Sequence, residues 1–153
     1  MKNIVYIFLI SMLPIIELRG AIPIAAMLEV EYYYAFAVSV IGNLLPVPFI
    51  LLFIPKILEF LGKFKPLEPV VGWILKKADK HSKKVLSGAF IGLLSFVMLP
   101  IPGTGAWTGA LIAALFKLPL WRSMLAIALG VIGCGIIMSL ATYGAVGFLS
   151  FLL

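Results

Sequence analysis

One uncharged stretch constrains this chain more than any other feature of its sequence. Residues 32–54 form a run of 23 residues without a single Lys, Arg, Asp or Glu. Folded as an α-helix, at about 1.5 Å per residue, such a run crosses a hydrocarbon core of about 30 Å. A second run, 119–141, is as long and carries one early charge, Arg122. We therefore predict two membrane-spanning helices, over 32–54 and 119–141.

The composition of the whole chain agrees with a membrane protein. Of its 153 residues, 63% are apolar and 12% are charged, whereas a soluble domain is about 45–50% apolar and about 25% charged. So few charged residues cannot cover a water-facing surface, which excludes a soluble domain, a coiled coil and a disordered tail. We predict a single all-α integral membrane domain over residues 1–153.

Two further apolar blocks, 3–28 and 85–116, are interrupted by proline and glycine. Proline inside a helix removes a backbone donor and clashes with the preceding turn, so neither block forms a straight span. Because each half is too short to cross a bilayer, we predict two re-entrant helical hairpins. Non-helical backbone at membrane depth persists only where it is buried in protein or lines a wet cavity. The residues assigned as hairpin breakers are Pro14, Gly20, Pro23, Pro100, Pro102, Gly103, Gly105 and Gly109.

The two halves of the chain resemble each other in layout. Repeat one, 1–54, and repeat two, 85–153, each contain a hairpin, a polar interface and a span, and the second ends in a short tail, 142–153. Met-Leu-Pro-Ile at 12–15 recurs at 98–101, and Gly42 recurs as Gly130, with offsets of 86 and 88. A hairpin returns to its own side and a span crosses, so the repeats are inverted. Transporters commonly use this plan, with the site at the midplane where broken helices meet.

Basic residues concentrate on one predicted side of the membrane. Residues 55–84 hold eight lysines, and Lys117 and Arg122 fall on the same side, which gathers ten of the twelve basic residues there. By the positive-inside rule this side is the cytoplasm. We therefore expect a protein of the cell membrane whose two termini lie on the outer side. Segment 55–84 begins with the residue pattern of an amphipathic helix that lies at the membrane interface. Its lysines either anchor and orient the chain or gather lipid phosphates, at about 1 kcal/mol each. The headgroup candidates are Lys76, Lys77, Lys80, Lys83, Lys84 and Arg122.

The apolar run near the N-terminus raises the question of a secretory signal. Glu17 and Arg19 occupy the positions where a cleavage site needs small residues, and Pro23 follows. We therefore expect this run to be part of the fold.

Two charged residues fall at predicted membrane depth, in the break of the first hairpin. An intramembrane charge costs at least about 2.5–3.5 kcal/mol on insertion scales, and it usually marks a pathway, a proton site or an ion pair. In a functional reading, Glu17 is the protonatable coupling group, and Arg19 pairs with it or holds an anionic headgroup. In a structural reading, the two side chains neutralise each other and only staple the hairpin.

The second hairpin and the first span supply the remaining candidates. Thr104, Trp107 and Thr108 surround the start of a helix near Ala106, where unpaired backbone amides favour anions. Asn43 is the polar residue of the first span, and it either faces the site or bonds another helix.

Metal and cofactor chemistry find no support in the sequence. The single histidine, His81, lies among lysines, and the single cysteine, Cys134, lies between two glycines in an apolar run. Neither has a second ligand nearby. We predict no metal site, no cofactor and no enzymatic activity.

Two segments carry a resemblance to a known family. ELRGAIP at 17–23 and PIPGTGAWTGA at 100–110 resemble the small multidrug export family, and the similarity covers nearly the whole chain. That family is more distantly similar to the DedA/VTT (SNARE-associated) superfamily, whose members have two inverted hairpin-plus-span repeats and are implicated in polyprenyl-phosphate and phospholipid movement. DedA-type proteins carry arginine at the tip of the second hairpin, where this chain has Thr104.

These observations predict a transporter that exports a small or lipid-like solute, coupled to protons, through a midplane site between the hairpins. The alternative is a DedA-like lipid scramblase or polyprenyl-phosphate flippase without ion coupling, and a third reading is a membrane organiser without transport. The expected partners are membrane lipids, the solute and protons, not nucleic acid. Because two spans and two hairpins shield a polar midplane poorly, we also expect a homo-oligomer, a dimer.

Overall fold

The computed structural model describes residues 2–61, 63, 69, 72 and 88–152, and every regular element in these ranges is an α-helix. The all-α prediction is therefore confirmed at this level. Two of the helical stretches, Tyr32–Leu61 and Leu120–Ala145, are long and apolar enough to cross a membrane. In chain order the helices are α1 Lys2–Ser11, α2 Glu17–Met27, α3 Tyr32–Leu44, α4 Pro46–Leu61, α6 Ala89–Met98, α7 Ala106–Leu115 and α8 Leu120–Leu152.

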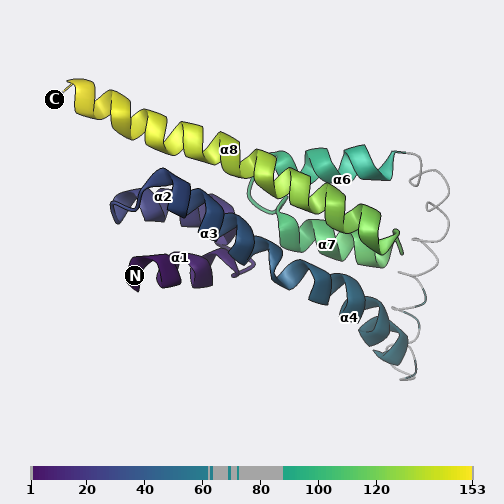
Figure 1. Cartoon of the computed structure of the whole chain (residues 1–153). Helices are drawn as coiled ribbons and strands as arrows, with labels where there is room; N and C mark the ends of the chain where they lie inside the picture. The colour runs from purple at the N-terminus through teal and green to yellow at the C-terminus, as the bar shows by residue number, and fades with distance from the viewer. Residues whose placement is uncertain (1, 62, 64–68, 70–71, 73–87, 153) are drawn as a thin grey trace.

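Two helical hairpins and two long helical paths make up the described fold (Figure 1). One hairpin consists of α1 and α2, the other of α6 and α7, and their turns lie in the middle of the molecule. The N-terminus, the α2–α3 connection and the C-terminus lie at one end, at the left of Figure 1. The end of α4 and the starts of α6 and α8 lie at the other end, at the right.

The first long path bends where the sequence places proline. α3 ends at Leu44, and α4 begins at Pro46, whose missing N–H is tolerated at the first position of a helix. α4 then runs through Pro55 to Leu61, past the expected end of the span at residue 54. Pro55 removes one backbone donor from α4, and the helix nevertheless continues through it, with α4 packed against α7. The expected amphipathic start of segment 55–84 thus belongs to α4.

The second long path is a single helix that includes the expected tail. α8 continues to Leu152, although a separate tail was expected at 142–153. Inside this last part, the hydroxyl of Tyr143 donates to the carbonyl of Val30 at 2.7 Å, and its ring lies edge-on to Tyr32, with 6.1 Å between centroids. These contacts join the end of α8 to the start of α3, so the two helices run antiparallel.

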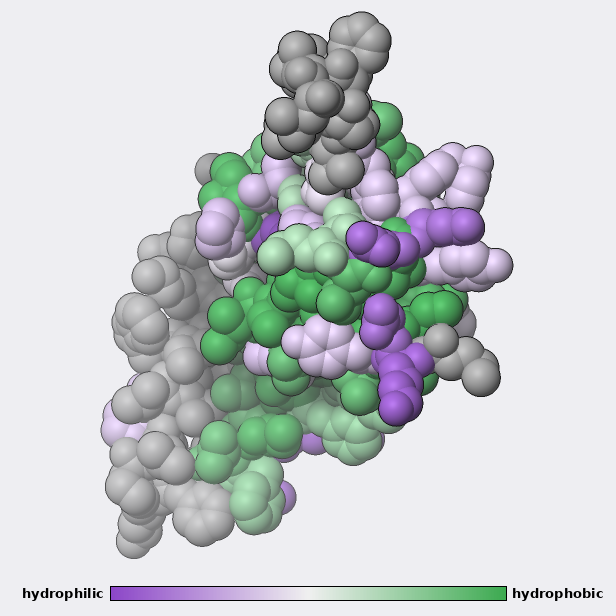
Figure 2. Space-filling view, turned by 90° about the vertical axis from the view of Figure 1, so that its left-hand side faces the viewer, coloured by the Kyte–Doolittle hydropathy of each residue, from purple (hydrophilic) through white to green (hydrophobic). Residues whose placement is uncertain are grey.

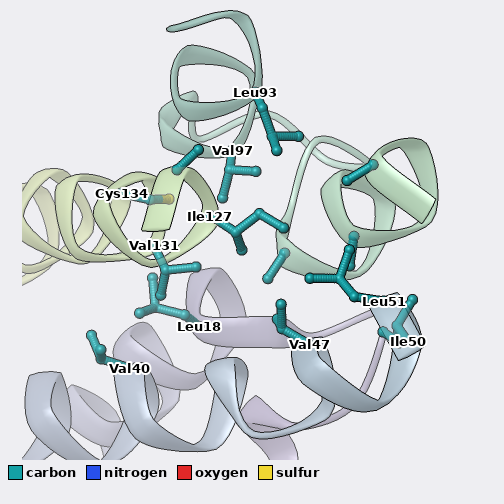
Figure 3. Close-up of a cluster of buried hydrophobic side chains, with 14 of the residues drawn as sticks. Leu18, Val40, Val47, Ile50, Leu51, Leu93, Val97, Ile127, Val131 and Cys134 are labelled. Atoms are coloured by element: carbon teal, nitrogen blue, oxygen red, sulfur yellow. The ribbon is translucent and has the colours of Figure 1, made fainter. Parts of the chain in front are cut away.

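The core lies where α2, α4, α6 and α8 meet (Figure 3). Leu18 from α2 and Val97 from α6 point toward Ile127 and Val131 of α8, and Val47 of α4 closes the cluster. All five side chains are at most 2% exposed. The core therefore joins helices from both halves of the chain, which fixes the two hairpins relative to each other.

Outside this core, large apolar side chains remain exposed along the helices, among them Leu140 (71%), Ile91 (70%) and Leu125 (57%). Exposed apolar surface of this extent marks a surface that contacts lipid or another protein. At the end of the molecule seen in Figure 2, hydrophilic residues lie beside strongly hydrophobic ones. Three consecutive tyrosines, 32–34, are exposed at the start of α3. Such tyrosines are typical of a membrane–water interface.

A close helix contact recurs at equivalent positions of the two halves. Gly42 of α3 packs against the backbone of Phe8 on α1, and a Cβ there would clash with it. Gly130 of α8 packs in the same way against the backbone of Leu94 on α6. Phe8 and Leu94 are 86 residues apart, which is the offset of the repeated Met-Leu-Pro-Ile segment.

The ends of α2 and α7 also share one geometry. The N–H groups of Val30 and Leu118 each donate to the carbonyl five residues earlier, at 2.9 Å. Glu29 and Lys117 precede them in the left-handed conformation, with φ of 56° and 51°. This arrangement is a Schellman cap, in which glycine usually occupies the left-handed position. The repeated Ala-Ala pairs at 25–26 and 113–114 belong to these two caps.

Three expected hairpin breakers lie inside helices instead. Gly20 and Pro23 are part of α2, and the non-helical turn of the first hairpin covers only 12–16. Pro23 costs α2 one hydrogen bond, but Ala21, Ile22 and Ala25 near it are fully buried, so packing holds the helix together. Gly109 lies within α7, where it packs against Val97. The second break covers 99–105, as the sequence indicates, and Gly103 takes a φ of 86° there.

Candidate functional site

The turns of the two hairpins meet. Side chains of each hairpin form hydrogen bonds with the backbone at the helix ends of the other. Glu17 and Arg19 come from the first turn of α2. Thr104 precedes α7, and Trp107 lies in its first turn. The structure therefore brings together four of the residues that the sequence singles out, from positions more than 80 residues apart.

Arg19 closes the C-terminal end of α6. Its Nη1 donates to the carbonyl of Ile101 at 2.7 Å, and its Nη2 donates to the carbonyl of Leu99 at 2.7 Å and of Val97 at 3.2 Å. Nη2 also reaches the hydroxyl of Thr104 at 3.0 Å. The last carbonyls of a helix have no partner within it, and a cation there is favoured by the helix dipole. The guanidinium group is thus bound by the backbone of the other hairpin.

Glu17 lies at the opposite kind of helix end, the start of α7. The backbone N–H of Trp107 donates to its Oε1 at 3.3 Å, and Nη1 of Arg19 lies 3.6 Å from its Oε2. A Cβ at Gly105 would overlap this carboxylate. Glu17, only 5% exposed, therefore acts as the cap that Gly105 cannot provide. The sequence predicts an anion at these amides, and the structure supplies that anion from the chain itself.

Trp107 makes the reciprocal contact to the first hairpin. Its indole Nε1 donates at 3.0 Å to the carbonyl of Met12, just after the end of α1. Arg19 and Trp107 are 88 residues apart, the same offset as Gly42 and Gly130. Each hairpin therefore sends one side-chain donor to the end of the other's first helix. Sequence reasoning names Trp107 but not this role, because no local signal marks the carbonyl of Met12 as its acceptor.

The backbone at Glu17 is itself unusual. Its φ is 50°, in the left-handed region that a residue with a Cβ rarely adopts. This conformation costs about 1–2 kcal/mol. It joins the turn to α2, and the contacts of the surrounding residues hold it.

An open groove of about 420 Å³ lies beside the paired charges. Glu17, Arg19 and Thr108 line it together with apolar residues of both turns, including Pro100 and Ile15. This volume falls within the range of about 300–1,000 Å³ that small-molecule sites occupy. Thr108 thus faces the groove, as a site residue should.

A much smaller internal cavity lies on another side of the same charges. Glu17, Arg19 and Asn43 line it, together with Gly105 and Cys134. Asn43 is 3% exposed and reaches the cavity from α3. The structure therefore places Asn43 next to the charged pair.

Of the lipid-headgroup candidates, the structure describes Arg122, and this residue does not join the site. Arg122 lies in the first turn of α8 and lines a separate pocket with Leu118 and Pro119. The other five candidates lie outside the described residues, as does His81, and they are Lys76, Lys77, Lys80, Lys83 and Lys84. Within the described ranges, no group of three His, Cys, Asp or Glu side chains is arranged to hold a metal ion.

Comparison with known proteins yields one match. The model of the family described as "Putative small multi-drug export protein" matches residues 17–137, which begin at the first residue of α2 and include the turn of the second hairpin. No curated protein and no solved structure matches the chain. The name of the matched family is that of a transporter, and together with the two long apolar helices it identifies a membrane protein.

Proposed function

The chain belongs to the small multi-drug export family, and from that premise we propose that it exports a small or lipid-like solute across the cell membrane in exchange for protons. The solute binds in the groove between the hairpin turns, and Glu17 carries the proton. One observation supports this most: a buried carboxylate–guanidinium pair lies where the two hairpins meet, beside an open groove.

In the membrane, the two hairpins are re-entrant and the two halves form inverted repeats. α1 and α7, with 10 residues each, are about 15 Å long, half of a hydrocarbon core of about 30 Å. The first hairpin then enters from outside and the second from the cytoplasm, so that their turns meet at the midplane. The recurring glycine contacts and Schellman caps support the repeat. Residues 55–84 lie in the cytoplasm, and both termini lie outside.

The contacts of Glu17 suggest how proton binding moves the hairpins. In the charged state, its carboxylate is attracted to the first amides of α7 and to Arg19. Protonation removes both attractions, so the turns separate more easily and the groove opens toward one side. Rigid-body movement of one repeat against the other then exposes the solute. The solute leaves when the groove faces outside, and the proton is released on the cytoplasmic side.

Transport in proteoliposomes tests this proposal directly. A panel of lipophilic solutes is measured with and without an imposed pH gradient, using the wild type and Glu17→Gln. The neutral amide cannot exchange a proton, so we expect gradient-driven transport to be lost. Glu31→Gln, an exposed acid at the start of α3, is the matched control and should transport as the wild type does. Full gradient-driven transport by Glu17→Gln would exclude the coupling role.

A lipid scramblase or flippase without ion coupling is the second candidate. It is favoured by the exposure of the groove's apolar margin, since Ile15 is 94% exposed and Pro100 lies beside it, so a lipid chain has access. In this case, labelled phospholipid or polyprenyl phosphate would cross the bilayer without a gradient, and Glu17→Gln would leave the rate unchanged. The proton-coupled proposal expects neither result.

The polar midplane also leads us to propose a dimer. Two spans and two hairpins surround the groove only in part, and the exposed apolar side chains offer surface for a second copy. Single-molecule photobleaching in bilayers should show two steps per particle. Single-step bleaching throughout would contradict the dimer.

A further inference from the structure

We propose that one water molecule is bound in the internal cavity between Glu17, Arg19 and Asn43, where it donates a hydrogen bond to the carboxylate of Glu17. The binding of this water stands on the geometry alone and does not depend on the proposed function. This site is distinct from the groove, because Asn43 and Cys134 line only the internal cavity.

Two buried polar atoms around this cavity lack partners. Nε of Arg19 and Oδ1 of Asn43 make no hydrogen bond to any described residue. An unpaired polar group in a dry interior costs about 1–3 kcal/mol, and such groups usually bond to ordered water. Both residues line the same cavity, together with the carboxylate-bearing Glu17. The volume of the cavity, about 10 Å³, lies at the lower limit for one water molecule.

The chemistry of the three side chains selects water over an ion. The guanidinium Nε of Arg19 is a donor and repels a cation. Oδ1 of Asn43 and the carboxylate of Glu17 are acceptors and repel an anion. The ligand must therefore accept one hydrogen bond and donate two. Water does both at once, and it pairs the two unpaired atoms that the described residues leave.

The water approaches the carboxylate of Glu17 from the internal cavity, whereas the solute approaches it from the groove. Glu17 lines both the groove and the internal cavity, so its carboxyl group lies between the two. A water held by Asn43 can donate a hydrogen bond to the carboxylate of Glu17 while the groove is occupied. Asn43 is then a positioning residue, which orients the water without contacting the solute.

Radiolytic hydroxyl labelling followed by mass spectrometry tests the water without any transport assay. X-rays generate hydroxyl radicals from bound water, and these modify the side chains next to it. Cys134 is buried, 3% exposed, and lines the cavity, so it reports on water there. We expect Cys134 to be labelled in the folded wild type. Asn43→Leu removes the acceptor and fills the cavity, so the labelling of Cys134 should be lost.

Two further variants keep the test decisive. Ser39→Ala, one turn earlier on α3 and equally buried, does not line the cavity, so it should leave the labelling of Cys134 unchanged. Asn43→Ala keeps room for water and should retain the labelling, so a loss of labelling in Asn43→Leu reports the filled cavity. If Asn43→Leu fails to fold, the comparison of buried residues within the wild type decides. The water site is refuted if Cys134 of the wild type is labelled no faster, after correction for intrinsic reactivity, than the buried Ile7 and Val47. Labelling that survives in folded Asn43→Leu refutes it as well.

Discussion

At the level of single residues, Arg19 makes more hydrogen bonds to the other hairpin than Glu17 does. Arg19 donates to three backbone carbonyls and one hydroxyl of the other hairpin, whereas Glu17 accepts one backbone N–H and faces Arg19 at 3.6 Å. A staple of two mutually neutralising charges would depend on both residues equally. The structure instead gives Arg19 partners of its own, which leaves Glu17 available to change its charge.

We therefore expect Arg19→Met to destabilise the protein much more than Glu17→Gln. Removing the guanidinium takes a charged donor away from the carbonyls of Val97, Leu99 and Ile101 and strands the carboxylate, at about 3–5 kcal/mol. Glu17→Gln keeps an acceptor for the N–H of Trp107, so it should cost only about 0.5–1.5 kcal/mol. Unfolding in mixed detergent micelles measures both changes, and Arg122→Met, at an exposed arginine, is the control. Equal losses for Arg19→Met and Glu17→Gln would favour the staple.

The charge swap adds a second test of the same pair. Glu17→Arg combined with Arg19→Glu would place a carboxylate against the carbonyls of Leu99 and Ile101. We expect this double variant to be less stable than either Arg19→Met or Glu17→Gln. A swap that restores the wild-type stability would contradict the backbone role of Arg19.

Trp107 is predicted to join the hairpins through one hydrogen bond. Trp107→Phe keeps an aromatic ring but removes the donor to the carbonyl of Met12, so it should cost about 0.5–1.5 kcal/mol of stability. Trp121→Phe is the matched control, because Trp121 is 79% exposed and should tolerate the change. The same unfolding assay compares them, and similar small effects of both would argue against the link.

At the level of the helices, glycine decides how closely the long helices approach the hairpins. A Cβ at Gly130 of α8 would meet Val97 and the backbone of Leu94, whereas a Cβ at Gly144 on the same helix would meet nothing within 4 Å. The two glycines share one helix and differ only in their surroundings. Substituting each of them by alanine therefore separates the effect of helix propensity on stability from the effect of close packing.

Gly130→Ala and Gly144→Ala should therefore shift stability in opposite directions. At Gly130 the added methyl group has to displace α6, which costs about 1–3 kcal/mol. At Gly144 alanine improves helix propensity, at up to about 1 kcal/mol. Thermal unfolding in detergent checks the signs. A neutral Gly130→Ala would mean that α6 and α8 do not pack as described.

At the level of the whole molecule, the arrangement of the helix ends carries a topology prediction. The ends of α4 and α7 lie at the same end of the molecule, and the start of α3 lies at the other. Single cysteines at Lys63 and Lys117 should thus be labelled from the cytoplasm, and one at Glu31 from outside, in a Cys134→Ala background. Impermeant maleimides on inside-out and right-side-out vesicles measure this. Outside labelling at Lys117 would support four conventional spans instead of re-entrant hairpins.

The sequence by itself determined the class of the protein and much of its helical plan. Charge-free runs, prolines and glycines act on the chain locally, so they predict apolar helices and the break at 99–105 without any knowledge of packing. The same local reasoning singled out Glu17 and Arg19, because a charge in an apolar block is costly wherever the block lies. The repeat also paired Gly42 with Gly130, but the helix contacts that these glycines make came only from the structure.

Only the tertiary structure decided which helix ends the charged and aromatic side chains cap. Arg19 and Trp107 bind carbonyls that lie more than 75 residues away in the chain, and no sequence pattern marks those carbonyls as unpaired. The same holds for Pro23 and for residues 142–152, which remain helical because neighbouring helices and the hydrogen-bond demand of an apolar environment outweigh local breaking signals. Local signals set where a helix can form, and the contacts between hairpins set where it ends and what it holds.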